Sequence, residues 1–260
     1  VELTERMAQF TIISSLITYL TNVLHKGLVS SAKNVNNWMG VTTVLPLVGG
    51  FLADSYFDRY WMVVACSFIY FLGLSLVTMA VSLSSLKPPT CPPHGPLNCD
   101  NASPAEVGLL FFGLYMVSFG AGGYKPSLGS YGPDQFDKHN PKERLQKHCF
   151  FNWFFIAISV GILLGTTVVV YVQENVSWGA GFGLVTAAFS LSIVVFLCGT
   201  SFYRNKVSVN AGNASPTSRI IQVFVAAARN RKLELPLDPT SLYQEDSEIE
   251  GRYLEHTQSF

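Results

Sequence analysis

The chain has 260 residues, of which 49% are hydrophobic and 13% are charged, and its 17 basic and 17 acidic side chains give a formal net charge of zero. Soluble domains carry about 25% charged residues, so the composition excludes an ordinary water-soluble globule and indicates a protein whose main solvent is lipid. The lysines and arginines are not gathered into one basic patch, so no nucleic-acid partner is indicated.

Six apolar segments approach the roughly 20 residues that an α-helix needs to cross the hydrocarbon core of a bilayer. Each is bounded by polar or turn-forming sequence, and membrane helices tolerate the Pro46 and Gly49 that the second segment contains. The predicted spans are about 7–25, 37–53, 61–82, 107–131, 149–172 and 178–203. Residues 1–203 are therefore expected to form an all-α membrane bundle of six transmembrane helices.

Small residues in the last two predicted spans indicate close helix packing, because helices in lipid approach one another where side chains are small. Gly161 and Gly165 lie four residues apart in the fifth span, and glycines recur at 179, 181 and 183 in the sixth. These spacings support a compact bundle, but they carry no information about a substrate.

The distribution of lysine and arginine between the spans predicts their orientation. One set of connecting segments carries Arg59, four basic residues within 138–147 and seven within 204–252, whereas the other set carries Lys26, Lys33 and Lys87. The richer side is expected to be cytoplasmic, which places both ends of the chain in the cytoplasm. No targeting signal chooses between the plasma membrane and the vacuolar membrane.

Two of the five cysteines, Cys91 and Cys99, lie in the polar, proline-rich segment 83–106, which this orientation places outside the cytoplasm. A disulfide between them would persist on an oxidising side of the membrane. His94 stands between the two, but three candidate ligands without a fourth do not make a zinc site. No metal is therefore predicted.

Residues 204–260 follow the last span and are predicted to be a cytoplasmic linker. Apolar residues recur at helical spacing within 218–229, which predicts an amphipathic helix at the membrane surface or against the bundle. The acidic run from Glu245 to Glu250 behind it is typical of a solvated segment.

Lys125 is a positive charge inside the fourth predicted span. It follows the glycine-rich stretch 111–124 and precedes Pro126, whose ring disfavours helical geometry at the lysine. A cation near the bilayer centre costs about 2.5–3.5 kcal/mol, so the lysine is expected to face a cavity and an acidic partner. The alternative is that Lys125 lies near the cytoplasmic end of its span and extends to the headgroups.

Glu2, Glu5 and Arg6 lie at positions i, i+3 and i+4, which places them on one face of a helix. Two carboxylates that share one guanidinium are not electrostatically equivalent. One can stay ionised while the other exchanges protons near neutral pH, as proton coupling requires. The alternative is a solvated, charged cap before the first span.

A second charged group, Asp54 and Arg59, lies in the short cytoplasmic turn between the second and third spans. Asp54 can accept backbone hydrogen bonds at the start of the next helix while Arg59 pairs with an acidic residue. Together they would form a latch that biases which side of the protein opens. The alternative is a plain charged turn that follows the topology rule.

Four motifs stand in a fixed order along the chain. They are Glu2-x-x-Glu5-Arg6, then Gly49-Gly-Phe-Leu-Ala-Asp54, then Lys125-Pro before Tyr131-Gly-Pro-Asp-Gln-Phe136, and finally Phe150-Phe-Asn-Trp-Phe-Phe155. In this order the motifs resemble the plant nitrate and peptide transporter family, a branch of the proton-dependent oligopeptide transporters within the major facilitator superfamily. The resemblance covers essentially the whole chain.

This resemblance implies a fold of twelve spans in two six-helix bundles, of which the chain would supply the first bundle and part of the central linker. The second, C-terminal bundle would be its missing partner. By resemblance, Glu2 and Glu5 are the proton-coupling carboxylates, and Arg6 is their partner and a substrate contact. Lys125 is the membrane lysine, which pairs with a carboxylate in the other bundle. Protons are the coupling ion, and no cofactor is implied.

The chain departs from the family pattern at several positions. Gln9 and Phe10 stand where many members have two tyrosines that contact peptide, which weakens the expectation of a peptide substrate. Met62 stands where some nitrate-carrying relatives have a phosphorylatable threonine, and Asp58 stands where glycine is usual.

The function expected from these features is proton-coupled transport of a small solute by alternating access between the two sides of a lipid bilayer. The solute would be nitrate, a di- or tripeptide, or another small organic anion. The alternative is a truncated, non-transporting fragment or a regulatory partner of a full-length transporter. An enzyme is not indicated, because no nucleophile elbow, phosphate-binding loop or His/Cys cluster supports one.

Overall fold

The computed structural model describes residues 1–55, 58–83, 102–136, 140–203 and 216–230, and for residues 54–55, 216–220 and 230 it describes the backbone alone. The chain divides into two compact units, Val1–Ser215 and Pro216–Phe260, and each is considered by itself. Cys91 and Cys99, the predicted disulfide pair, lie outside the described residues.

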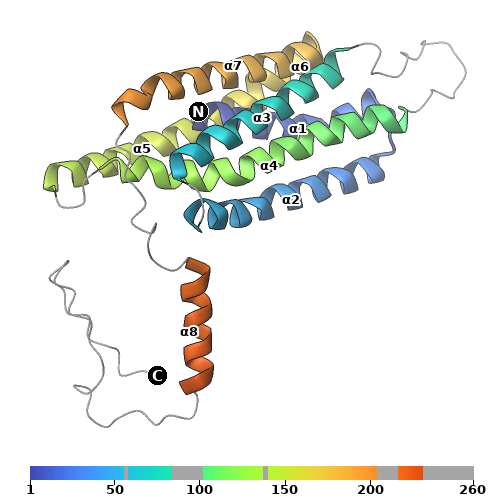
Figure 1. Ribbon diagram of the computed structural model, residues 1–260. Helices are drawn as coiled ribbons and strands as arrows, with labels where there is room; N and C mark the ends of the chain where they lie inside the picture. Colours follow the sequence, from blue (N-terminus) through green and yellow to red (C-terminus); the bar gives the residue numbers. More distant parts are fainter. Residues whose placement is uncertain (56–57, 84–101, 137–139, 204–215, 231–260) are drawn as a thin grey trace, which may run out of the picture. The chain divides into compact units, whose positions relative to one another are not determined.

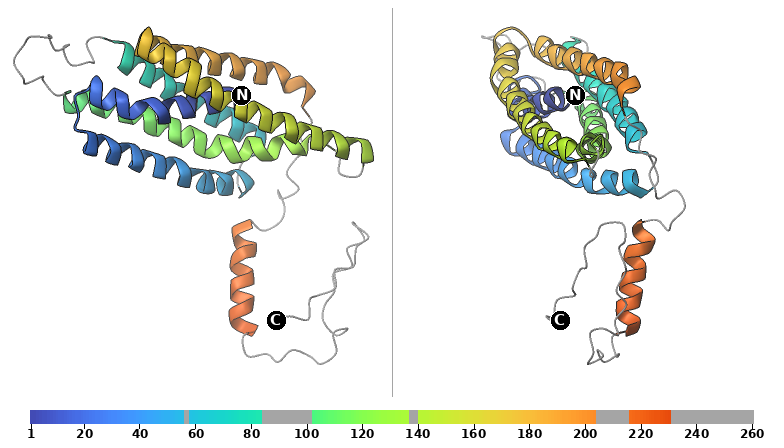
Figure 2. Two further views of the ribbon diagram at one scale, coloured as in Figure 1. Left: turned by 180° about the vertical axis from the view of Figure 1, so that it is seen from behind. Right: turned by 90° about the vertical axis from the view of Figure 1, so that its left-hand side faces the viewer.

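The first unit is a bundle of long helices that run side by side (Figure 1). Its elements are α1 (Glu2–Asn22), α2 (Leu28–Ser55), α3 (Arg59–Ser82), α4 (Pro104–Asp134), α5 (Pro141–Leu164), the π-helical turn η2 (Gly165–Val169), α6 (Val170–Asn175), α7 (Trp178–Cys198) and the 3-10 turn η3 (Gly199–Phe202). The start of α1 lies among the surrounding helices in both views of Figure 2. The fold class is all-α, as predicted.

Four helices in the described part of the chain are long and apolar enough to cross a membrane: Arg59–Ser82, Pro104–Asp134, Pro141–Asn175 and Trp178–Phe202. The other two long helices, α1 and α2, have 21 and 28 residues, which is sufficient length. Their sequences are more polar, because α1 carries three charges in its first two turns and α2 begins with several asparagine and serine residues. The count of six spans therefore remains a prediction.

Helix caps explain why α4 and α5 begin before their apolar runs. Ser103 and Glu106 form a capping box at the start of α4, in which each side chain bonds the backbone of the other residue. Asn140 caps α5 by accepting the backbone N–H of Lys142 at 3.1 Å, and Pro141 occupies the first helical position. The helices thus begin at residues 104 and 141, whereas the apolar pattern predicted spans from 107 and 149.

The packing of α1 against α5 uses the two glycines predicted from their spacing. A methyl group at Gly161 would collide with the carbonyl oxygen of Leu3, and one at Gly165 would collide with that of Met7. Gly165 also begins the π-helical turn, and the hydroxyl of Thr11 donates to its carbonyl oxygen at 3.1 Å. The fifth predicted span and α1 therefore approach backbone to backbone, which confirms the role expected for these glycines.

Helix α4 continues through Lys125, although the proline that follows was predicted to interrupt helical geometry there. Pro126 has no N–H to offer the carbonyl of Gly122, one turn earlier. Gly49 of α2 packs directly against this carbonyl, with no room for a side chain. Buried bonds from α2 to α4, including Trp38 Nε1 to the Leu114 carbonyl at 3.0 Å, hold the two helices together, so the helix is retained.

The second unit contains α8 (Pro216–Asn230). Among its described side chains, Ile221, Phe224 and Val225 are all exposed within the unit. Their spacing of three to four residues places them near one another on the helix surface. The predicted amphipathic helix at 218–229 lies within these bounds.

Candidate functional site

The first two turns of α1 present a stripe of four polar side chains. Glu2, Glu5, Arg6 and Gln9 follow one another at i, i+3, i+4 and i+7, so all four project from the same helix face. The two acidic residues lie in the first turn, where the positive end of the helix dipole favours negative charge. This stripe is the core of the candidate site.

Arg6 binds both carboxylates of the stripe. Its Nε lies 2.8 Å from Oε1 of Glu2, with a well-aligned hydrogen bond, and 3.7 Å from Oε2 of Glu5. The Glu5 side chain is completely buried, and the Glu2 side chain is 8% exposed. The predicted grouping of two carboxylates around one guanidinium is therefore present, and it lies inside the bundle instead of forming a solvated cap.

Lys125 reaches this group from α4. Its Nζ lies 3.3 Å from Oε1 of Glu5 and donates a 2.6 Å hydrogen bond to Oε1 of Gln9. The Lys125 side chain is 15% exposed, and its ammonium points to the α1 stripe and not toward solvent. The acidic partner that the lysine was expected to need is thus Glu5 in the same bundle.

Gln9 completes a ring of contacts. Its amide oxygen accepts from Lys125 and also from Nη1 of Arg6, at 3.4 Å. The ring therefore runs from Arg6 to Glu5, from Glu5 to Lys125, and through Gln9 back to Arg6. Two carboxylates and two cations face one another here, so the cluster is neutral when all four are ionised.

The interior around Glu5 contains further polar groups that have no hydrogen-bond partner in the described part of the chain. Neither Glu5 oxygen accepts a well-aligned hydrogen bond from the described residues, and the buried hydroxyls of Tyr70 and Tyr124 likewise have no partner among them. Among the described residues, the contacts that compensate the Glu5 charge are its ion pairs with Arg6 and Lys125. A carboxylate in this position depends strongly on its two cations, because ionised groups are costly to bury without compensation.

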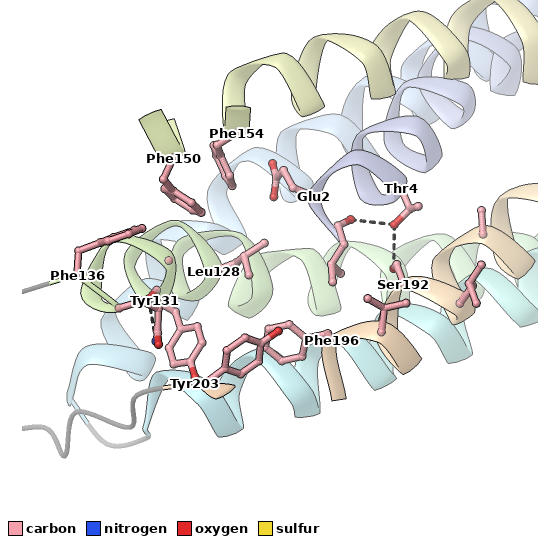
Figure 3. Close-up of a pocket in the computed structure, with 16 residues that line it drawn as sticks. Glu2, Thr4, Leu128, Tyr131, Phe136, Phe150, Phe154, Ser192, Phe196 and Tyr203 are labelled. Atoms are coloured by element: carbon pink, nitrogen blue, oxygen red, sulfur yellow. Dashed lines mark hydrogen bonds between the residues drawn. The ribbon is translucent and has the colours of Figure 1, made fainter. Parts of the chain in front are cut away.

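A cavity of about 630 Å³ opens beside the start of α1 (Figure 3). It is lined by residues of α1, α4, α5 and α7, and Glu2 contributes to its wall. Its aromatic lining residues are Tyr131, Phe136, Phe150, Phe154, Phe196 and Tyr203. Glu2 thus borders both the charged ring and an open, mainly apolar space.

The predicted latch residues are only partly visible. Arg59, the first residue of α3, forms an ion pair with Asp134 at the end of α4, and the two side chains are 38% and 36% exposed. The side chain of Asp54 lies outside the described residues. Asp58 occupies the N-cap of α3 without a side-chain capping bond. The pairing of Arg59 with an acidic residue is present, and the latch itself remains a prediction.

No group of three or more His, Cys, Asp or Glu side chains in the described ranges is arranged to hold a metal ion. Cys66, Cys149 and Cys198 carry free thiols. The ionisable groups that the described residues bring together at the site are the carboxylates of Glu2 and Glu5 and the cations of Arg6 and Lys125.

Comparison with known proteins identifies the family. Residues 60–256, more than half of the chain, match the profile PTR2, which describes the POT family. The chain belongs to the POT family. Relatives in Arabidopsis thaliana include NRT1/PTR family 8.3, at 43% identity over 98% of this chain, and NRT1/PTR family 5.1, at 44% identity over 94%. POT family members are membrane transporters and not enzymes.

The POT fold is also seen in solved structures. The chain aligns with a TM-score of 0.64 to the crystal structure of the peptide transporter POT in complex with sulfate, at 18% identity and over 88% of this chain. It aligns with a TM-score of 0.63 to the POT family transporter PepTSo, also at 18% identity. The chain spans about 43% of the length of NRT1/PTR family 8.3 and about 42% of the sulfate complex, so it corresponds to part of a POT transporter.

Two residues of this POT chain received no role from the sequence. In the sequence pattern Gln9 is only a departure from the family motif, although its position three residues after Arg6 and seven after Glu2 places it on the same stripe. Asp134 belongs to the motif Tyr131–Phe136, but the motif does not identify it as the partner of Arg59. The predicted topology does indicate that Asp134 and Arg59 can meet, because it places the end of the fourth span and the start of the third span on the same side of the membrane.

Proposed function

We propose that this chain forms the N-terminal half of a proton-coupled transporter that moves a small anionic or zwitterionic solute by alternating access. The solute class comprises nitrate, di- and tripeptides and other small organic anions. Membership of the POT family supports proton-coupled transport. The chain spans less than half of the length of its relatives, which supports the assignment as half of a transporter. Both ends of the chain are proposed to lie in the cytoplasm, at the plasma membrane or the vacuolar membrane.

The observation that carries this proposal is the charge-balanced cluster of Glu2, Glu5, Arg6 and Lys125, in which Gln9 contacts both cations. A proton on Glu5 removes the negative charge that holds Lys125 and part of Arg6. The cluster, with Glu2 still ionised, then carries one net positive charge inside the bundle, which a solute anion can neutralise. Proton uptake and anion binding are thereby coupled through one carboxylate.

The remaining charges fit this scheme as supporting groups. Glu2 stays paired with Arg6 at 2.8 Å and keeps the guanidinium in place while Glu5 changes its charge. In alternating access the two bundles rock against each other around a site near the membrane midplane. Asp54 and Arg59 would act at the cytoplasmic end of the bundle as a gate that is made and broken during this motion.

The test is uptake into proteoliposomes that contain the full-length parent transporter, with nitrate and the dipeptide alanyl-alanine as probes and an imposed proton gradient. Glu5→Gln keeps the shape of the side chain but cannot exchange a proton. It is expected to abolish gradient-driven accumulation while leaving exchange of solute across the membrane measurable.

The matched control is Glu174→Gln, which makes the same chemical change at an exposed glutamate of α6 and is expected to leave uptake unchanged. Uptake that is indifferent both to the proton gradient and to Glu5→Gln would overturn the proposed function.

A further inference from the structure

Gln9 is the only uncharged side chain in the ring described above, and its geometry is specific. Its amide oxygen lies 2.6 Å from Nζ of Lys125 and 3.4 Å from Nη1 of Arg6. The ammonium and guanidinium groups are donors only, so the carbonyl oxygen of the amide must face them and the NH₂ group must point away. One neutral acceptor thus touches both cations of the site.

The Gln9 amide oxygen offsets the repulsion between Lys125 and Arg6 that arises when Glu5 is neutral. Lys125 and Arg6 would then repel each other across a buried space, and a flexible lysine would move away to find another acceptor. A carboxylate at position 9 would hold the two cations more strongly, but it would also occupy them as an internal anion. An amide attracts both cations and leaves their positive charge uncancelled.

We propose that Gln9 is a positioning and selectivity residue that holds Lys125 and Arg6 together as a two-cation site for a small monoanionic group. The ligand class is a planar anion such as nitrate or a carboxylate. Its oxygens can accept hydrogen bonds from a guanidinium and from an adjacent ammonium at the same time. This inference rests on the proposed function, because it requires the state in which Glu5 carries a proton.

Four charged side chains surround Gln9, and a test of its role must leave all four unchanged. Glu2, Glu5 and Arg6 face it from α1, and Lys125 faces it from α4. A change at Gln9 that preserves these four residues leaves the proton-coupling carboxylates intact. Its effect should therefore be seen in anion affinity at a given pH and not in the requirement for protons.

The experiment measures anion binding to the purified full-length transporter in detergent, with nitrate and acetate as probes and thermal stabilisation as the readout. Gln9→Leu removes the acceptor at nearly constant volume. At acidic pH it is expected to weaken anion binding by about tenfold, the effect of losing one charge-assisted contact. Gln222→Leu, the same change at an exposed position of α8, is expected to bind as the wild type does.

Gln9→Glu keeps the result interpretable if Gln9→Leu does not fold. The added carboxylate is expected to suppress anion binding at neutral pH. At acidic pH, where the protonated side chain has nearly the shape of glutamine, binding should return toward the wild-type value measured at that pH. A merely structural role of Gln9 would give no such pH-dependent recovery.

Absence of nitrate and acetate binding in the wild type, or unchanged binding in Gln9→Leu and Gln9→Glu, would overturn this inference. Neither outcome decides the proposed function, because gradient-driven uptake and its dependence on Glu5 are measured separately. Conversely, uptake that ignores the proton gradient, together with anion binding that depends on Gln9, would overturn the proposed function and retain the two-cation site.

Discussion

The buried carboxylate of Glu5 depends on the ammonium of Lys125 to offset the cost of burying its charge. Glu5 is fully buried, and the ammonium of Lys125 lies 3.3 Å from its carboxylate. Lys125→Met is expected to destabilise the full-length transporter by about 3–5 kcal/mol at neutral pH, because it leaves a buried charge without its nearest partner. The free energy of unfolding in detergent, measured with chemical denaturant, gives this value.

The same pair allows a stricter test through a double variant. Adding Glu5→Gln to Lys125→Met removes the uncompensated charge, so most of the lost stability should return while transport stays absent. Lys125→Met alone should also be less destabilising at acidic pH, where a protonated Glu5 needs no counter-charge. Equal destabilisation by the single and double variants at every pH would contradict the pairing.

At the scale of the element, the contact between α1 and α5 depends on backbones that approach at glycine. Gly161→Ala is expected to destabilise the bundle by about 1–3 kcal/mol, because the new methyl group meets the carbonyl oxygen of Leu3. Gly108→Ala, within α4, is the control, since nothing lies within 4 Å of the position a methyl group would take. There the helix should gain about 0.5–1 kcal/mol.

Thermal unfolding of the two glycine variants in detergent measures this difference. The α1 stripe carries the charged ring, so displacement of α1 by Gly161→Ala should also reduce proton-driven uptake, whereas Gly108→Ala should not. Equal unfolding temperatures for the two variants would show that α5 does not press against α1 at this glycine.

The elements themselves were largely predictable, because apolar runs of span length and helix-capping residues are properties of the local sequence. Four helices with the length and hydropathy of membrane spans confirm the all-α membrane class. The π-helical turn at Gly165–Val169 was not predicted, since its residues continue the apolar pattern of the helix on both sides. Its stabilising contact comes from Thr11, more than 150 residues away, and such a contact has no local signal.

The candidate site was predictable only where its residues share one element. The spacing of Glu2, Glu5 and Arg6 places them together on any helix, whereas the position of Lys125 depends on how α4 packs within the bundle. The family resemblance suggested that the lysine pairs with a carboxylate in the other bundle. In this structure its partners are Glu5 and Gln9. The carboxylate partner in the other bundle stays a prediction.

At the scale of the whole molecule, the charged ring belongs to a chain that spans about 43% of the length of NRT1/PTR family 8.3. Alternating access needs a second bundle to close the site from each side in turn. The 260-residue chain reconstituted alone is therefore expected to show no proton-driven uptake of nitrate or alanyl-alanine. Co-expression with the remaining part of the parent, as a separate chain, should restore uptake, because membrane helices that insert independently can associate within the bilayer.

This complementation also decides between the transporter and the regulatory alternative. Recovery of uptake, and its loss when the co-expressed half-chain carries Glu5→Gln, would show that the ring works as one wall of a shared site. Inhibition of the intact parent by the half-chain, without recovery in the split pair, would instead favour a regulatory partner that occupies the place of the native N-terminal bundle. Gradient-driven uptake by the half-chain alone would contradict the need for a second bundle and would point to a site completed by another copy of the chain.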